Sequence, residues 1–282
     1  MSIPVTIGDI FYGILAPAAV AAIAVWLWRH ATSERWRPLA LPLAFVVGFH
    51  AGYWLLRLGP ARPESHWQWL PWLLLLALPA GAPPLRKRST FAALTIGIAA
   101  VSGWLLVPTW EHLDPSRNTH LMVFVAAFVL VVAALQPLTT RVPGLWLLAN
   151  LIGVLAAGAA VLGLSGSLRF AQIAGCGVAA LTGLTIAARF LGGRICSEGL
   201  VLPFALLVTG LMLIGRVNSF SDVPLMSYVL PPLAPLSLWL ATSDRVAGTG
   251  WRRWLVLMLP LVVCGTAVGL AAANELANQD SW

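Results

Sequence analysis

Three side chains in the second apolar stretch have types and spacing that could do chemistry together. His50, Tyr53 and Arg57 stand three and seven residues apart in the segment GFHAGYWLLR, so a helix would place them on one face. An imidazole can exchange a proton near neutral pH, and a guanidinium can bind a carboxylate or a phosphate. The stripe predicts a polar cavity. A histidine bonded to a neighbouring helix, with Tyr53 and Arg57 simply near the helix end, explains the same residues equally well.

Arg169, Gln172 and Cys176 repeat this spacing at the start of the seventh apolar stretch. We expect Arg169 and Gln172 to line the same cavity. Asp9 and Tyr12 stand at the corresponding end of the first stretch. The loop TWEHLDPSRNTH adds a group of charged and imidazole side chains, Glu111, His112, Asp114, Arg117 and His120. This uneven distribution favours a polar site over ordinary solvated loops at one end of the molecule.

The segment PLMSYVLPPLAPLSLW contributes Tyr228 as a further candidate binding residue. Pro231, Pro232 and Pro235 remove backbone donors from consecutive turns and leave carbonyl groups without their helical partners. Those carbonyls need other partners. A water-filled cavity or an ion would satisfy them, and so would neighbouring helices together with Ser237.

No catalytic or metal-binding motif accompanies these candidates. The segment GLSGS at 163–167 resembles the serine motif of rhomboid proteases, but that family takes its base from a later histidine and none follows His120. His112 and His120 are spaced too loosely to indicate a zinc site. We therefore expect no catalytic residue and no metal site. The sequence identifies no cofactor, and haem ligation through His50 stays open.

The elements that hold these residues are predicted to be membrane-spanning helices. The chain has 282 residues, of which 59% are hydrophobic and 10% charged, far from the roughly 25% charged content of soluble domains. We expect an all-α polytopic membrane protein with about ten transmembrane helices in a single integral membrane domain. The third stretch, which is short and contains two prolines, could instead be re-entrant. The ten stretches are 7–28, 38–56, 67–82, 90–107, 119–138, 143–164, 169–190, 199–215, 224–242 and 251–274.

Basic residues predict the orientation of these helices. Twelve of the seventeen Lys and Arg residues fall in alternate connections, and connections rich in basic residues remain in the cytoplasm. Both termini and the loop around His112 are therefore expected on the outer side. The first ten residues lack Lys and Arg, so we expect the first stretch to be retained as a span. The Arg-rich composition favours a bacterial inner membrane. The basic charge is dispersed over short loops, which indicates anionic lipid and not nucleic acid as its partner.

Five spans on each side of Arg141 would permit two inverted halves, 1–140 and 141–282, although their sequences show no evident similarity. Small residues at four-residue spacing predict close helix packing in several spans. For Gly265 and Gly269 we favour an internal neighbour over a dimer contact. The three cysteines, Cys176, Cys196 and Cys264, are expected to be small buried apolar side chains.

The preferred functional interpretation is a transporter of a small solute or lipid-like substrate. Its polar cavity would lie in the outer half of the membrane, lined by the candidate residues given above. The alternative is a membrane subunit that binds quinone or haem, or that anchors the partner subunits of a larger complex. The fourteen tryptophans, which gather near span ends, are typical of aromatic belts. Stacking on a ligand is the less favoured interpretation of any one of them.

Overall fold

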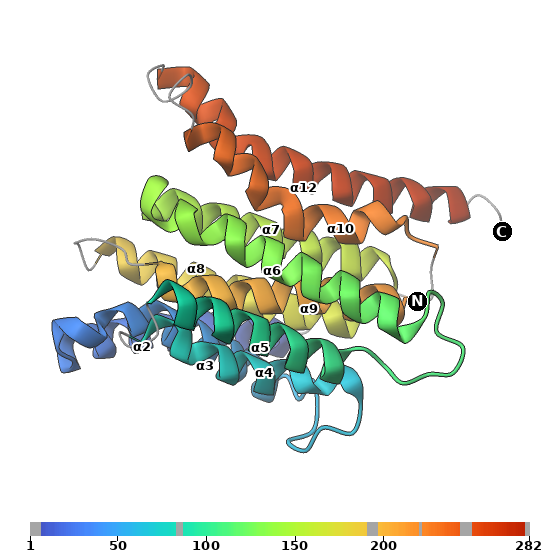
Figure 1. Cartoon of the computed structure of the whole chain (residues 1–282), viewed down its shortest axis with the longest axis horizontal. Helices are drawn as coiled ribbons and strands as arrows, with labels where there is room; N and C mark the ends of the chain where they lie inside the picture. Colours follow the sequence, from blue (N-terminus) through green and yellow to red (C-terminus); the bar gives the residue numbers. More distant parts are fainter. Residues whose placement is uncertain (1–6, 83–86, 191–196, 220–221, 243–249, 280–282) are drawn as a thin grey trace.

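A computed structural model describes residues 7–82, 87–190, 197–219, 222–242 and 250–279. Within these ranges the chain is helical and contains no strand. Eight helices are long and apolar enough to cross a membrane, as expected for a helical membrane protein. Figure 1 shows the helices lying side by side in one bundle.

The first three apolar stretches fold as α-helices flanked or interrupted by short irregular turns, and the fourth is one continuous α-helix. The π-helical turn η1 and the 3₁₀ turns η2, η3 and η4 extend the α-helices next to them. The elements are α1 (Ile7–Ile10), η1 (Phe11–Leu15), α2 (Ala16–Ala31), η2 (Glu34–Leu39), α3 (Ala40–Leu55), η3 (His66–Trp69), α4 (Leu70–Ala77), η4 (Leu78–Gly81) and α5 (Arg88–Leu106).

The remaining stretches form longer helices, except for the proline-rich segment. That segment divides into a short α-helix and a 3₁₀ helix. The elements are α6 (Arg117–Arg141), α7 (Gly144–Leu164), α8 (Leu168–Phe190), η6 (Glu198–Leu200), α9 (Val201–Val217), α10 (Leu225–Leu233), η7 (Ala234–Thr242) and α12 (Gly250–Gln279).

Eight of the ten expected stretches coincide with the membrane-length helices. The third stretch is helical from His66 to Gly81, but it consists of three short pieces. The ninth is helical from Leu225 to Thr242 and is also shorter than a typical span. Prolines account for both interruptions, because they lack the N–H that an α-helix requires.

Helices α2, α3 and α8 pack closely through small residues. A side chain at Gly48 of α3 would meet the Cβ atoms of Ala21 at 2.7 Å and of Ala180 at 3.1 Å. A side chain at Gly183 of α8 would collide with the Ala18 backbone of α2. These three helices therefore form a tightly packed unit, in the way that small residues allow in lipid.

Helix α9 lies at the centre of the bundle, and nearly all of its side chains are buried. It contacts α4, α6, α7 and α10. Helix α12 lies at one edge, where it packs on α7, α10 and η7. Positions Gly265 and Gly269 of α12 face open space, with no atom within 4 Å of an added Cβ. The expectation of an internal neighbour at this pair is therefore wrong.

The proline-rich ninth segment is stabilised by its neighbours. The Ser237 hydroxyl donates a 2.7 Å hydrogen bond to the Ala234 carbonyl, and the Trp239 indole N–H donates to Ala134 O of α6 at 3.1 Å. The guanidinium of Arg141 lies 5.0 Å from the Trp239 ring centroid. The carbonyls that Pro231, Pro232 and Pro235 free belong to Ser227, Tyr228 and Pro231. The Pro231 carbonyl accepts from the Ala234 N–H, and the three contacts above do not involve the other two, so both interpretations stay open.

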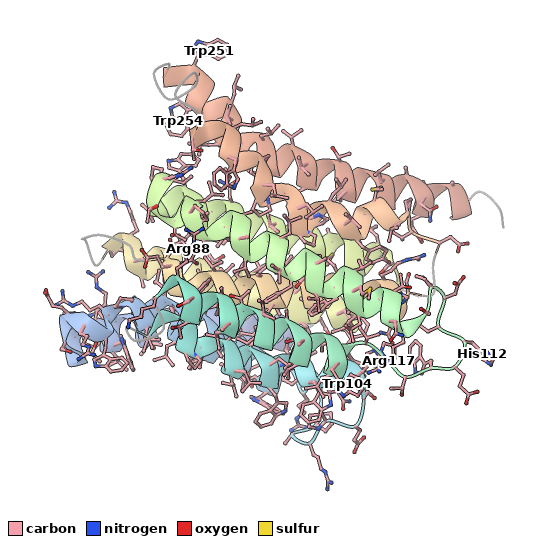
Figure 2. The ribbon with its side chains drawn as sticks, in the orientation of Figure 1. Arg88, Trp104, His112, Arg117, Trp251 and Trp254 are labelled. Carbon is pink, nitrogen blue, oxygen red and sulfur yellow. The ribbon has the colours of Figure 1, made fainter. Side chains whose placement is uncertain are left out.

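Two ends of the bundle can be distinguished by labelled side chains. Arg88, Trp251 and Trp254 lie toward one end in Figure 2, while Trp104, His112 and Arg117 lie toward the other. We call these the Arg88 end and the Arg117 end. Both Cys176 and Cys264 are buried free thiols, as expected, whereas Cys196 lies outside the described residues.

Candidate functional site

His50 is held on α3 by a hydrogen bond within its own helix. Its Nδ1 lies 2.7 Å from Val46 O, and because a carbonyl only accepts, Nδ1 carries the proton. In the neutral ring Nε2 is then an acceptor. Nε2 is buried without a hydrogen-bond partner, and the ring packs edge-on against Phe49 at 5.6 Å. The backbone of Pro71 in α4 also acts on the ring as a hydrogen-bonding neighbour, so His50 lies between α3 and α4.

Tyr53 lies one turn further along α3 and is also buried, with 1% of its surface exposed. Its hydroxyl has no hydrogen-bond partner. The backbone of Gly59 passes so close to this hydroxyl that any side chain at position 59 would collide with it. The phenol therefore lies beneath the loop that follows α3.

Arg57 departs from the face that His50 and Tyr53 share. Helix α3 ends at Leu55, and Arg57 adopts φ 52°. Its N–H donates to Trp54 O, and the next N–H, of Leu58, donates to Tyr53 O, both at 3.1 Å. This is a Schellman motif with arginine at the left-handed position that glycine usually takes. The side chain is exposed, so the helical stripe stops at Tyr53.

Arg169 approaches Tyr53 from the start of α8. Its positive charge acts on the phenol, and its guanidinium carbon lies 5.4 Å from the Trp67 ring centroid. Trp67 also packs edge-on against Phe170 at 5.7 Å. Gln172, one turn along α8, is half-buried. The ends of α3 and α8 therefore meet beside Trp67, and three predicted residues, His50, Tyr53 and Arg169, share this region.

Tyr228 lies elsewhere. It is buried on α10, close to Gly215 of α9, and its hydroxyl has no partner. Helix α10 packs on α7, α9 and α12. Figure 1 places α10 next to α12, on the opposite side of the bundle from α3. Tyr228 is therefore not brought together with the α3 and α8 residues.

A cavity of about 430 Å³ lies next to Trp67 at the Arg117 end. We call it the outer cavity. It is formed by the segment before α4, the connection between α5 and α6, and the end of α9. Its lining residues are Glu64, Ser65, His66, Trp67, Trp104, Leu105, Val107, Pro108, Thr109, Trp110, Arg117 and Asn218.

Arg117 is the basic residue of the outer cavity. Its guanidinium lies 4.4 Å from the Trp104 ring centroid, a cation–π geometry. One terminal nitrogen donates to Trp104 O at 3.0 Å, and Nε is buried without a partner. The side chain is therefore fixed in position while part of its donor capacity is unused.

His66 and Asn218 form the opposite part of the lining. The Asn218 amide nitrogen lies 3.1 Å from His66 Nε2 and also donates to Ile214 O at 2.8 Å. Because the amide nitrogen donates, Nε2 accepts and the imidazole proton belongs on Nδ1. Burial lowers the pKa of His66 to about 4. The ring is consequently neutral at physiological pH and contributes no positive charge.

Most of the charged loop between α5 and α6 does not join this cavity. Glu111, His112 and Asp114 are exposed, and Figure 2 places His112 at the tip of the loop, away from the bundle. His120 bonds back to Ser116 O at 3.3 Å. Tyr12 is 43% exposed, and the side chain of Asp9 lies outside the described part. Of the loop group, only Arg117 lines the outer cavity.

Asn218 and Trp67 are the functional candidates that sequence reasoning missed. Asn218 is the C-cap residue that follows α9, a helix with Thr209 and Arg216 as its other polar residues, and this position at a span end was the only signal it offered. Trp67 resembles the many other tryptophans at span ends. Among the described residues, no three His, Cys, Asp or Glu side chains are grouped as a metal site would require.

Comparisons with known proteins assign no family. No protein-family model, no curated protein and no solved structure matches the chain.

Proposed function

We propose that this protein is a transporter of a small anionic solute or lipid-like substrate and that the outer cavity is its binding site. The observation that carries the proposal is Arg117, which is held over Trp104 with its Nε buried and unpaired. A guanidinium fixed on an aromatic face is suited to planar recognition of carboxylate or phosphate. The cavity volume is in the range of small-molecule sites.

The same proposal includes the orientation and the number of spans. With basic residues on the cytoplasmic side, the Arg117 end faces outward from a bacterial inner membrane and the outer cavity opens there. The short segments at 67–82 and 224–242 complete ten spans in this arrangement. His50, Tyr53 and Arg169 form a polar region on the far side of Trp67, which connects it with the cavity.

Binding of simple anions to purified protein tests the site. We expect benzoate and phenyl phosphate to raise the melting temperature of the parent, whereas benzylammonium has no effect. Arg117→Lys keeps the charge but loses the planar fork, so it should lose the response to the anions. Arg62→Lys is the matched control, because Arg62 is exposed in the loop that follows α3 and does not line the cavity. Equal responses in Arg117→Lys and the parent would contradict the proposal.

The alternative of a quinone- or haem-binding or anchoring subunit makes a different prediction for the same preparation. His50 is its candidate ligand, because it is a half-buried imidazole in an otherwise apolar part of α3. A Soret band, a co-purified quinone or a co-purified partner subunit would support this alternative. The transporter proposal expects a colourless protein whose ligand response depends on Arg117.

A further inference from the structure

A second cavity, of about 580 Å³, lies at the Arg88 end between α5 and α6. We call it the inner cavity. The turns η2, η4 and η6 close its back wall, where Gly199 packs so closely that an added Cβ would lie 2.7 Å from the Cα of Gly81. The lining residues are Pro38, Ala80, Gly81, Arg88, Phe91, Ala92, Thr95, Ile96, Val129, Val132, Ala133, Gln136, Pro137, Glu198 and Gly199.

The inner cavity is open on the side that faces the bilayer. Ile96 of α5 is 59% exposed, and Ala92 and Ala133 are exposed next to it. Exposed apolar side chains along a membrane-spanning helix face the acyl chains of lipids. A lipid can therefore enter the cavity laterally between α5 and α6.

One wall of the inner cavity carries hydrogen-bond acceptors that lack partners or their usual donors. The side-chain oxygen Oε1 of Gln136 is buried without a partner. Pro137 has no N–H, so the Ala133 carbonyl, four residues earlier in α6, loses its usual donor. Both Gln136 and Ala133 line the cavity. Buried acceptors of this kind are costly unless a partner supplies N–H or O–H groups.

Charged groups of both signs line the same cavity. Arg88 is exposed at the start of α5, and a guanidinium binds phosphate well. Glu198 of η6 is half-buried and already has an interaction partner, so the acceptor left for an ammonium is Gln136. A phosphate, a nearby ammonium and an apolar tail together match the basic, acceptor-rich and apolar parts of the lining.

We propose that the inner cavity binds one phospholipid with a phosphoethanolamine headgroup, taken from the adjacent leaflet. The phosphate binds to Arg88, the ammonium donates to Gln136 Oε1, and one acyl chain lies between α5 and α6. This site is at the opposite end of the bundle from the outer cavity, and it does not depend on the proposed transport function.

Titration of the delipidated full-length protein with two dioleoyl lipids tests this proposal, with bound lipid counted by native mass spectrometry. Phosphatidylethanolamine and phosphatidylcholine carry the same charges, but the choline nitrogen has no N–H donor. We expect phosphatidylethanolamine to bind about tenfold more tightly, because charged hydrogen bonds to an otherwise orphaned acceptor have this order of effect.

Two variants assign the preference to the cavity. Gln136→Leu removes the acceptor and should abolish the preference for phosphatidylethanolamine while phosphatidylcholine binding is unchanged. Arg88→Gln should weaken the binding of both lipids. Arg189→Gln is the control, because Arg189 is exposed at the end of α8 and lies outside the cavity lining. Unfolding temperatures of all variants identify any that fold poorly.

Several outcomes would overturn the proposal. Equal affinity for the two lipids, or a preference that survives in Gln136→Leu, would show that the Gln136 oxygen does not recognise the headgroup. Tighter binding of phosphatidylglycerol would show that charge alone is recognised. Equally tight binding of glycerophosphoethanolamine, which lacks acyl chains, would show that the apolar residues of α5 and α6 do not bind an acyl chain. None of these results depends on anion binding at Arg117, so each proposal can fail separately.

Discussion

Arg57 shows how one residue can look functional in the sequence and have a structural role in the fold. Its spacing from His50 predicts a shared helical face, but the helix ends two residues earlier and the chain turns through a left-handed conformation. Sequence periodicity cannot detect such an ending when the residue at the turn is not glycine. The turn after α7, by contrast, has Gly166 with φ 78° and the same pair of backbone hydrogen bonds. The GLSGS segment is therefore a helix end.

We expect Arg57→Gly to stabilise the protein by about 0.5–1 kcal/mol, because glycine adopts a left-handed conformation without the steric cost that an L-residue pays. Gly166→Ala is the reverse experiment and should destabilise it by about 1 kcal/mol. Reversible unfolding in mixed micelles measures both changes. If Arg57→Gly instead lowers stability, the arginine side chain makes contacts that outweigh the strain of its backbone.

His66 should make stability depend on pH. Its pKa falls from 6.5 to about 4 on folding, so the unfolded chain binds a proton more readily than the native state between these values. Stability is therefore unaffected above about pH 6.5 and decreases as the pH falls toward 4. His66→Gln should flatten this part of the melting-temperature profile, whereas His112→Gln, at an exposed loop position, should leave it as in the parent. Superimposable melting-temperature profiles for the parent and His66→Gln would show that His66 does not cause this pH dependence.

At the scale of elements, hydropathy predicted where the helices lie but not how they pack. Apolar stretches indicate helices because backbone groups must be satisfied internally in lipid, and all ten stretches contain helical backbone. The glycine pairs were poorer predictors of which helices pack together. Gly48 and Gly52 contact α2 and α8, whereas Gly265 and Gly269 contact nothing. A small residue only permits a close approach, and which helix approaches is decided by the whole bundle.

Two glycines of α8 provide a matched test of this packing. Gly183→Ala should destabilise the protein by about 1–3 kcal/mol or more, because the new methyl group collides with the Ala18 backbone. Gly175→Ala places the same methyl group on the same helix with no atom within 4 Å, so it should be neutral or stabilise by up to about 1 kcal/mol. Unfolding in mixed micelles compares them. Equal effects would mean that α2 and α8 are not in close contact.

At the scale of the whole molecule, the candidate site depends on contacts that no local pattern contains. His66 and Asn218 are hydrogen-bonded across 152 residues of sequence, and Trp67 connects residues from α3, α8 and the α5–α6 connection. Sequence reasoning placed Tyr53 and Arg169 in one predicted site, and in the fold the ends of α3 and α8 that carry them meet beside Trp67; their role in binding stays a prediction. Sequence reasoning could not place Tyr228, since a span's position around the bundle is not encoded in its composition.

The orientation of the molecule can be tested by labelling in intact cells. Single cysteines at Pro60 and Pro115 should react with an impermeant thiol reagent, whereas cysteines at Ser33 and Ser89 should not, because connections rich in basic residues stay in the cytoplasm. The parent, whose described cysteines are buried, gives the background. Labelling only at Ser33 and Ser89 would invert the orientation and place the outer cavity on the cytoplasmic side.

Helices α5 and α6 line both the outer cavity at the Arg117 end and the inner cavity at the Arg88 end. Helices α2, α3 and α8, by contrast, pack so closely that their backbones nearly touch. Helices α5 and α6 therefore each contribute lining residues at both ends of the bundle. A substitution that shifts α5 or α6 along its whole length would alter both linings at once, so such a variant has to be tested with the anions and with the lipids.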